Sequence, residues 1–507
     1  MKSVIIIIAF ISICFKSFGQ SYYGQSWITG GGNSYKVKFE NQQRNISVFD
    51  TNYNFYFHLG SSCISDSNGN LRIICDGYNL MDSMGNLIDN GDTLVPKLYF
   101  VHEGGWSIYS QSSIILPFAD DIYYIITPAA SDYEVTTYWN NPPLGRALFD
   151  LLLYHKVDMK LNGGAGKVVK KAIPLLENVK LSKTQMMACR HANGVDWWLL
   201  KQAHDTNMVY RFLVTKDSIY NYGTQGFAEP HFTKWDLFGQ IMFNQEGTKY
   251  ATTSIGINQL FTTDFDRCTG QLTSPKTINI ANHQNQPLDT TQNISSAGLC
   301  FSPNGNFIYI VKAFNLFQYE WNEPDSALAW YHIANLDTTW AQFQKWTCAY
   351  LGPDNKVYIG NLNGLGKAMS VIDNPDIKGA GCGFCPKCFQ FPKIGSNTPP
   401  CMPNYELGAT GQPCWTLEST QLTANSKQLE VYPNPVNTIL FIKTESKDEK
   451  ELYNSVGQLL FSTKTNKIDV SLYSKGIYYL KVGNTEDITN AVKRMPLLRL
   501  PYVTASI

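Results

Sequence analysis

Residues 301–313 have the sequence FSPNGNFIYIVKA, in which a polar Asn-Gly turn precedes a strand of aromatic and β-branched residues. Five other segments repeat this unit, each with a polar turn before such a strand. The six copies are SDSNGNLRIICDG (65–77), ILPFADDIYYIITP (115–128), RHANGVDWWLLKQ (190–202), MFNQEGTKYATTS (242–254), FSPNGNFIYIVKA (301–313) and LGPDNKVYIGNLN (351–363). Most successive turns lie about 50 to 58 residues apart, and a strand-built repeat of this length is typical of β-propeller blades.

The repeat predicts an all-β chain with a six- or seven-bladed β-propeller, and seven blades are favoured. The seventh blade would join strands around residues 46–59 to strands near 369–372, so that no sheet edge is exposed where the ring closes. An ordinary β-sandwich with recurring turns is the alternative. The propeller is favoured because a sandwich of this length would far exceed the roughly 100 residues of common sandwich domains.

Longer segments of the body resemble a propeller family that is common in secreted Bacteroidetes proteins. The segments that carry this resemblance are SSCISDSNGNLRIICDGYNLMDSMGNLIDNG (61–91), QSSIILPFADDIYYIITP (111–128), VDMKLNGGAGKVVKKAIPLL (157–176), the turn FSPNGNFIY (301–309), IDNPDIKGAGC (372–382) and MPNYELG (402–408). The resemblance covers roughly residues 46–408 and implies the propeller fold. Its motifs are turns and strand ends, so it transfers no catalytic residue.

The C-terminal region contains three strand-like runs separated by Pro, Asn and Gly turns: LEVYPNPVNTILFI, ELYNSVGQLLF and IDVSLYSKGIYYLKV. Their order and spacing resemble the C-terminal sorting domain of type IX secretion substrates. The motif residues that carry this resemblance are Pro433, Asn434, Pro435, Gly457, Gly476 and Tyr478. The resemblance implies a small immunoglobulin-like β-sandwich, handling by the type IX secretion machinery, and delivery through the periplasm to the outer cell surface or the medium.

The N-terminus has the pattern of a secretory signal peptide. Met1 and Lys2 precede an apolar run of about a dozen residues, and Ser17 and Gly19 supply the small residues before a cleavage site. This run is too short to cross a bilayer, which takes about twenty residues. A lipoprotein signal ending at Cys14 is the alternative. The expected organisation is a signal peptide (1–19), the propeller (20–415), a Ser/Thr-rich linker (416–428), the sorting domain (429–495) and an atypical C-terminal extension (496–507).

The cysteines suggest disulfides. Five of the twelve crowd the end of the propeller, and the Cys-x-x-Cys-x-x-Cys run among them also has the spacing of zinc ligands. Because an exported chain folds in an oxidising compartment, disulfides are favoured over metal. Cys63 and Cys75 lie on the two arms of one predicted hairpin and are expected to face each other, whereas a Cys300–Cys348 pair is less convincing. The disulfide candidates are Cys63, Cys75, Cys382, Cys385, Cys388, Cys401 and Cys414.

Other motifs have a structural interpretation. Asp66, Asn68 and Asn70 superficially resemble a calcium loop, but Gly69 and the following residues do not fit an EF-hand, so a type I′ turn is favoured. A structural calcium ion stays an open alternative, and no other cofactor is expected. The glycine-rich run 163–167 lacks the first Gly and the final Ser or Thr of a phosphate-binding loop. The eight histidines form no metal-binding pair in the sequence, so no catalytic, cofactor-binding or metal residue is predicted.

These features favour a non-enzymatic surface protein that binds a glycan or a protein. Charge is balanced, with 41 basic and 41 acidic residues, so no nucleic-acid partner is expected, and no transmembrane segment is expected in the mature chain. One alternative is a polysaccharide lyase or hydrolase with histidines and acids meeting at the propeller channel, and another is a structural component of the surface or gliding layer. The tryptophans considered for sugar stacking are Trp27, Trp106, Trp139, Trp197 and Trp198.

Overall fold

The computed structural model describes residues 22–31, 33–39, 49–51, 53, 55–105, 107–119, 121–139, 148–204, 206–227, 239–254, 259–280, 296–312, 314–325, 328–336, 345–361, 366–411, 414, 430–432, 438–443, 447–453, 459–473, 477–482 and 502–506. The chain divides into two compact units, residues 1–415 and 416–507. We call them the propeller unit and the tail unit and describe each by itself.

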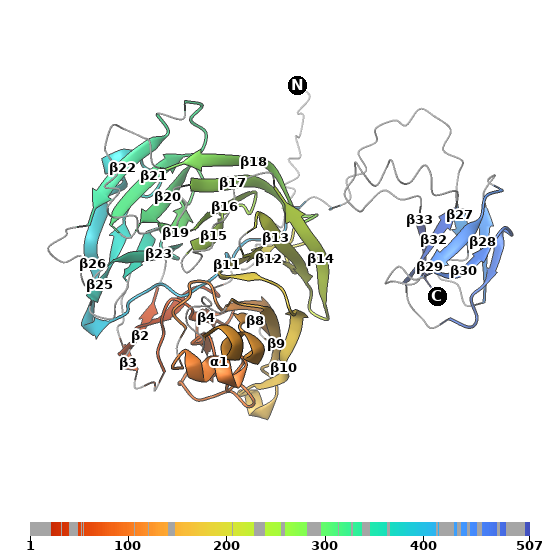
Figure 1. Cartoon of the computed structure of the whole chain (residues 1–507), viewed down its shortest axis with the longest axis horizontal. Coiled ribbons are helices and arrows are strands. Elements are labelled where there is room, and N and C mark those ends of the chain that lie inside the picture. The colour runs from red at the N-terminus through yellow and green to blue at the C-terminus, as the bar shows by residue number, and fades with distance from the viewer. Residues whose placement is uncertain are drawn as a thin grey trace, which may run out of the picture. The chain divides into compact units, whose positions relative to one another are not determined.

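Six antiparallel sheets of the propeller unit each contain one of the six sequence repeats, and the turn of the repeat joins the first two strands of its sheet. The strands are β4 (Ser62–Ser65), β5 (Leu71–Cys75) and β6 (Leu80–Asp82); β7 (Ile114–Phe118), β8 (Ile122–Ala129), β9 (Leu151–Asp158) and β10 (Lys167–Leu176); β11 (Leu181–Arg190), β12 (Trp197–Ala203), β13 (Met208–Val214) and β14 (Ile219–Gly226); β15 (Gly239–Phe243), β16 (Lys249–Ser254), β17 (Gln259–Asp266) and β18 (Gln271–Asn279); β19 (Ser296–Phe301), β20 (Phe307–Lys312), β21 (Asn315–Glu320) and β22 (Trp330–Asn335); β23 (Trp346–Leu351), β24 (Val357–Asn361), β25 (Gly366–Ile372) and β26 (Phe384–Gly395). Figure 1 shows these sheets arranged around a common axis.

The first strand of each sheet packs against the first strand of the next sheet, from β4 through β7, β11, β15 and β19 to β23. These strands therefore surround the axis. Burial follows this order: every residue of β11 and β12 is buried, whereas the outermost strand β14 is largely exposed. Inner strands have both faces covered by neighbouring sheets, which explains why their sequences are apolar runs with little alternation.

The ring closes through a separate N-terminal sheet, β1 (Ser26–Thr29), β2 (Ser34–Lys38) and β3 (Phe49–Thr51). Strand β1 packs against β4 on one side. On the other side, the Trp27 ring meets the Tyr358 ring of β24 edge to face at 5.1 Å, and the Tyr35 ring lies 5.2 Å from that of Phe391 in β26. This short sheet stands between the first and the last repeat sheets.

The propeller is confirmed, but the predicted shared closing blade is wrong. Strand β3 pairs with β2, and β25 pairs with β24 and β26, so the segments around 46–59 and 369–372 lie in different sheets. The sequence repeat missed β1 and β2, which give β3 its partners, and it missed the long strand β26, which covers the edge of β25. In the described residues the propeller unit has six repeat blades and one short closing sheet, and the shared blade on which the preference for seven blades rested is replaced by two separate sheets.

Short helices lie between some strands of the propeller unit. Those in the described part of the chain are α1 (Lys97–His102), α2 (Asp132–Glu134), the π-helical turn η1 (Val135–Trp139) and the 3-10 turns η2 (Asn162–Gly164) and η5 (Gly379–Cys382). Among the described residues, no helix has the length and apolar character that a membrane crossing requires. The predicted signal peptide lies outside the described residues.

The tail unit contains two sheets around a small core. One sheet consists of β27 (Glu430–Tyr432), β28 (Ile439–Lys443) and β31 (Lys467–Asp469), and the other of β30 (Leu459–Thr463), β29 (Lys450–Tyr453), β32 (Ile477–Val482) and β33 (Tyr502–Ser506). Their shared core is Leu440, Ile442, Leu452, Ile468, Val470 and Leu480. Part of the predicted extension therefore forms an edge strand, because β33 pairs with β32. An immunoglobulin-like connectivity remains a prediction.

Candidate functional site at the channel mouth

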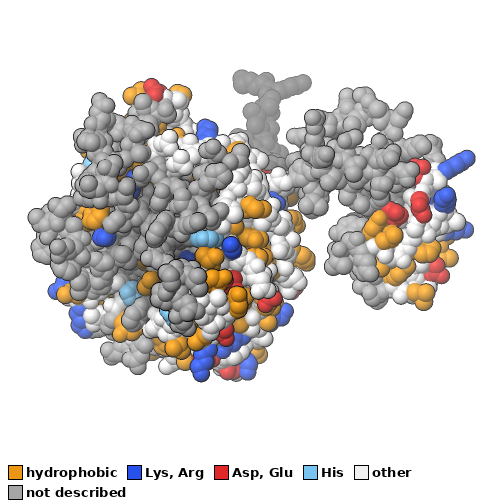
Figure 2. Space-filling model, viewed as in Figure 1, with side chains coloured by type: hydrophobic (Ala, Val, Ile, Leu, Met, Phe, Trp, Pro, Cys, Tyr) orange, Lys and Arg blue, Asp and Glu red, His pale blue; other side chains and the backbone are white. Residues whose placement is uncertain are grey.

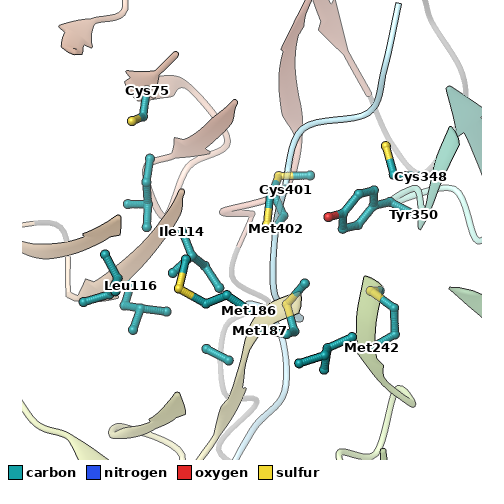
Figure 3. Packing of buried hydrophobic residues seen from close by; sticks show 14 of the residues in the cluster. Cys75, Ile114, Leu116, Met186, Met187, Met242, Cys348, Tyr350, Cys401 and Met402 are labelled. Carbon is teal, nitrogen blue, oxygen red and sulfur yellow. The ribbon is translucent and has the colours of Figure 1, made fainter. Parts of the chain in front are cut away.

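The axis of the propeller is occupied by residues 396–411, which we call the strap. Residues 396–403 are buried although they form no strand. Figure 3 shows the strap, with Cys401 and Met402, running between the innermost strands of opposite sheets. A buried segment without secondary structure must satisfy its backbone polar groups elsewhere, and the strap does so by bonding to the surrounding sheets.

The strap is hydrogen-bonded to the sheets on several sides of the axis. The Thr398 backbone N–H donates to Thr29 Oγ1 at 3.0 Å, and the Cys401 N–H donates to the Ser61 carbonyl at 2.8 Å. The Tyr405 hydroxyl donates to the Ile115 carbonyl at 2.8 Å. The strap is thereby bonded to the closing sheet and to the first two repeat sheets.

Two arginines hold the last part of the strap. Arg190, at the end of β11, donates from its guanidinium to the Tyr405 carbonyl, and the guanidinium stacks over the Trp197 ring at 3.8 Å from its centroid. Arg267 donates to the Gly408 carbonyl. Burial lowers the pKa of Arg190 to about 10, so the side chain stays cationic at neutral pH and its hydrogen bonds remain charge-assisted.

A disulfide fixes the residue just beyond the strap. Cys414 is bonded to Cys268, which lies in the turn between β17 and β18, and their Cα atoms are 5.1 Å apart. His191 Nε2 lies 3.2 Å from the Cys268 carbonyl oxygen and 3.9 Å from the Cys414 sulfur. The strap therefore ends at a covalent bond to the fourth repeat sheet, counted from β4.

Three buried glutamines bond to neighbouring sheets around the axis, Gln111 and Gln240 to innermost strands and Gln185 to β16. Gln111 donates to the Ile241 carbonyl at 2.7 Å and accepts from the Ile241 N–H at 2.9 Å, as a neighbouring strand would. Gln185 donates to Thr252 Oγ1 and the Thr253 carbonyl. Gln240 donates to the Ala349 carbonyl and accepts from the N–H groups of Leu299 and Ala349. The side-chain amides of Gln111 and Gln240 thus replace backbone partners that the innermost strands lack.

A pocket of about 130 Å³ opens beside the strap at one mouth of the channel. Its floor is apolar and rich in sulfur, and its rim is polar. The lining residues are Gly24, Met187, Ala188, Cys189, Met242, Phe243, Asn244, Gln245, Tyr350, Leu351, Gly352, Pro353, Asn355, Met402, Pro403, Asn404, Tyr405, Glu406 and Leu407. They come from the segment before β1, from β11, from the β15–β16 and β23–β24 hairpins and from the strap.

Hydrogen bonds hold the rim residues in place, and the thiol on the floor of the pocket has low reactivity. Asn404 Nδ2 donates to Gln245 Oε1 at 2.7 Å and to the Gln245 carbonyl at 3.0 Å, which fixes the strap against the β15–β16 turn. Glu406 is exposed at the rim. Burial raises the pKa of the Cys189 thiol to about 12, so this thiol is protonated at neutral pH and is a poor nucleophile. The arrangement suits non-covalent recognition of a small group.

Residues 430–495 match the family model of the secretion system C-terminal sorting domain. The tail is a sorting domain. It marks the protein for the type IX secretion machinery and hence for export to the cell surface or the medium, as the motif residues implied. Pro433, Asn434, Pro435, Gly457 and Gly476 lie outside the described residues, and Tyr478 lies in β32, opposite Ala505 of β33. No curated protein sequence matches the chain.

Several solved structures are similar to this chain. The β-propeller domain of Cps50 (Swd1) from Myceliophteria thermophila has 11% identity and a TM-score of 0.38, covering 68% of this chain and 94% of that one. The periplasmic gluconolactonase of Pseudomonas aeruginosa has 9% identity and a TM-score of 0.34, covering 74% and 97%. Hsv2 of Kluyveromyces lactis has 9% identity and a TM-score of 0.35, covering 68% and 89%.

The predicted disulfides need correction. Cys385 and Cys388 are bonded to each other, and Cys414 is bonded to Cys268, which was not a candidate. The other four candidates, together with Cys300 and Cys348, are unpaired buried thiols; these four are Cys63, Cys75, Cys382 and Cys401.

The strand register explains why the hairpin cysteines are apart. Cys63 is opposite Ile74, and Cys75 is opposite Ser62. Adjacent residues of a strand point to opposite faces, so the two thiols lie on different faces of the sheet. In the Cys-x-x-Cys-x-x-Cys run, Cys385 and Cys388 are joined, and Cys382 interacts with the Tyr309 hydroxyl.

The tryptophans considered for sugar stacking are core residues wherever their side chains are described. Trp27, Trp197 and Trp198 are at most 1% exposed, and the side chains of Trp106 and Trp139 lie outside the described part of the chain. The described histidines do not line the pocket. His155, for example, is buried between Thr127 Oγ1 and the Ala172 N–H, and His231 and His283 fall outside the description.

Asp66 stabilises a turn. Its Oδ1 accepts from the backbone N–H groups of Asn68 and Asn70, both at 2.9 Å, and its Oδ2 accepts from Asn70 Nδ2 at 3.3 Å. Among the described residues, no three His, Cys, Asp or Glu side chains are grouped to hold a metal ion. The strap was visible in the sequence only as the motif MPNYELG, because nothing local in its sequence indicates that it lies along the axis.

Proposed function

We propose that the exported propeller is a non-enzymatic binding module that engages a glycan or a protein at the face around the pocket. The observation that supports this proposal is the occupied axis: the strap fills the space in which a propeller enzyme would gather its catalytic groups. The pocket beside it combines an apolar floor with a hydrogen-bonded polar rim, as binding sites commonly do. Among its described lining residues, no nucleophile is paired with a general base.

The size of the pocket limits what enters it. A cavity of about 130 Å³ admits one ring or one side chain, because cavities of about 150 Å³ hold a benzene molecule. A partner would therefore insert a single group and make its other contacts with the surrounding turns. Where its residues are described, the face of the propeller that Figure 2 shows carries interspersed hydrophobic, basic and acidic side chains.

A glycan array with product analysis, together with cross-linking of the mature protein to cell-surface proteins, tests the proposal. Glu406→Arg reverses the charge at the rim, so we expect it to weaken binding of any identified partner. Glu177→Arg, an exposed change after the outermost strand β10, is the matched control and should leave binding unchanged. Equal loss in both variants, or no loss in either, would place the contact elsewhere.

The alternatives predict other outcomes. Turnover of a bound glycan would favour a secreted polysaccharide lyase or hydrolase. If the array gives no ligand and cross-links join the protein only to the surface or gliding layer, a structural role is favoured.

A further inference from the structure

Three methionines from three separate elements face the pocket. Met187 lies on β11, Met242 on β15 and Met402 on the strap, and all three line the same cavity. They are 1%, 9% and 9% exposed. Figure 3 shows these side chains, with their sulfur atoms, around the space between β11, β15 and the strap.

These thioethers line space that they do not fill. Methionine commonly serves as a flexible filler of irregular cores, but a filler would have closed the cavity of about 130 Å³ that remains here. The cavity also opens to solvent at the channel mouth, where the rim residue Glu406 is exposed. A cavity that is lined by sulfur atoms and open to solvent can admit a ligand.

The Met242 sulfur is held in place. Gln240 Nε2 lies 3.3 Å from Met242 Sδ and donates to it. The same Gln240 amide is fixed by its bonds to Ala349 and Leu299. A thioether sulfur carries two lone pairs, and the amide engages one of them, so the hydrogen bond leaves the sulfur with one further donor pair.

The ligand set selects a soft ion. Thioethers bind Cu(I) and similar soft monovalent cations, whereas hard cations such as Mg²⁺ and Ca²⁺ require oxygen ligands. Glu406 is the carboxylate among the lining residues, and it is at the rim. Binding at neutral thioethers releases no proton, whereas binding at a thiol does.

We propose that Met187, Met242 and Met402 form a binding site for one soft monovalent cation, Cu(I) or Ag(I), at the floor of the pocket. The site does not depend on the proposed partner binding, because its ligands lie below the rim. The ion would be held by three thioether sulfur atoms, and the Cys189 thiol, which is also a soft donor, lines the same pocket.

Titration of Ag(I) into the mature full-length protein, with the methionine methyl groups labelled with carbon-13, tests this site. We expect the methyl resonances of Met187, Met242 and Met402 to shift together and to saturate at one equivalent. Because thioethers carry no proton, we expect the same response at pH 6 and pH 8. A response that strengthens markedly with rising pH would assign the ion to the Cys189 thiol and would overturn the proposal. Met186, which precedes Met187 on β11 and is not among the lining residues, supplies the matched control.

Met187→Leu, Met242→Leu and Met402→Leu should each abolish the shifts of the remaining two methionines, whereas Met186→Leu should preserve all three. Leucine has nearly the volume of methionine, and the other methyl resonances report whether each variant is folded. Binding of Ag(I) without a shift at these three methyls, which would indicate thiol sites, overturns the proposal. Absence of binding in the unmodified protein overturns it as well.

Discussion

Individual buried polar side chains around the channel contribute strongly to the free energy of unfolding of the propeller. Gln240→Leu removes the acceptor for the N–H groups of Leu299 and Ala349 and the donor to the Ala349 carbonyl. Buried backbone groups left unsatisfied cost about 1–3 kcal/mol each, so we expect the free energy of unfolding to fall by about 2–4 kcal/mol in urea denaturation. Gln259→Leu, whose amide bonds to the exposed Asn279 side chain, should change the free energy of unfolding by less than about 0.5 kcal/mol.

The Asp76 carboxyl group makes the free energy of unfolding depend on pH. Burial raises the pKa of Asp76 to about 6, whereas an unfolded aspartate titrates near 3.9. The folded state then binds this proton more tightly, so the contribution is present in full below about pH 4 and is lost as the pH rises through about 6. The unfolding free energy of wild type minus that of Asp76→Asn should therefore rise by about 1–3 kcal/mol between about pH 7.5 and pH 4.5.

His155 makes the unfolding free energy change with pH in the opposite direction. Burial lowers the pKa of His155 to about 3, so its contribution to stability is lost as the pH falls below about 6.5. Both proteins in the Asp76 comparison share this effect, so the difference between them isolates Asp76. A difference that does not change with pH would mean that the Asp76 carboxylate is solvated. Denaturation curves of wild type and Asp76→Asn across this pH range measure the difference in unfolding free energy.

At the scale of elements, the hairpins were predictable and the axis was not. The turn of each repeat is encoded by neighbouring residues, such as the Asp66 carboxylate that bonds Asn68 and Asn70, so local sequence was enough. Strands β1 and β2 and the strap depend on contacts hundreds of residues away, such as Thr29 with Thr398. No local pattern reports such contacts. The register that separates Cys63 from Cys75, and the Cys268–Cys414 pair, escaped prediction for the same reason.

Tyr405 anchors the strap. Its hydroxyl bonds to the Ile115 carbonyl, and its ring contacts those of Tyr23 and Trp197 edge to face. Tyr405→Ala leaves a cavity between three sheets, and we expect a loss of about 3–5 kcal/mol of unfolding free energy. Tyr405→Phe keeps the ring and should cost about 1–2 kcal/mol. Similar losses in both variants would show that the hydroxyl, and not the packing, holds the strap.

For the whole molecule, the Cys268–Cys414 bond should dominate the effect of reducing agents. It joins residues 146 apart, whereas Cys385 and Cys388 are 3 apart. Cross-links that close long loops constrain the unfolded chain most, so replacing both Cys268 and Cys414 by Ser should cost the propeller about 2–5 kcal/mol. The Cys385→Ser, Cys388→Ser pair is the control and should cost much less. Calorimetry should show the transition of the sorting domain unchanged in both.

Export gives the second prediction for the whole molecule. Deleting residues 429–507 removes the sorting domain, so the propeller should accumulate folded in the periplasm. Fractionation and surface proteolysis measure this. A second truncation after residue 495 tests the extension that includes β33, and it should still reach the surface. Surface display of the 429–507 deletion would contradict the role of the tail.

The disulfide at the end of the strap has a mechanical consequence. A pull on the chain beyond Cys414, as a machine that grips the sorting domain would exert, reaches Cys268 through a covalent bond before it reaches Thr410 or Tyr405. The load enters at the β17–β18 turn, whose strands are joined along their length. The strap lies outside this load path. Force applied to the tail can therefore move the propeller without pulling the strap out of the channel.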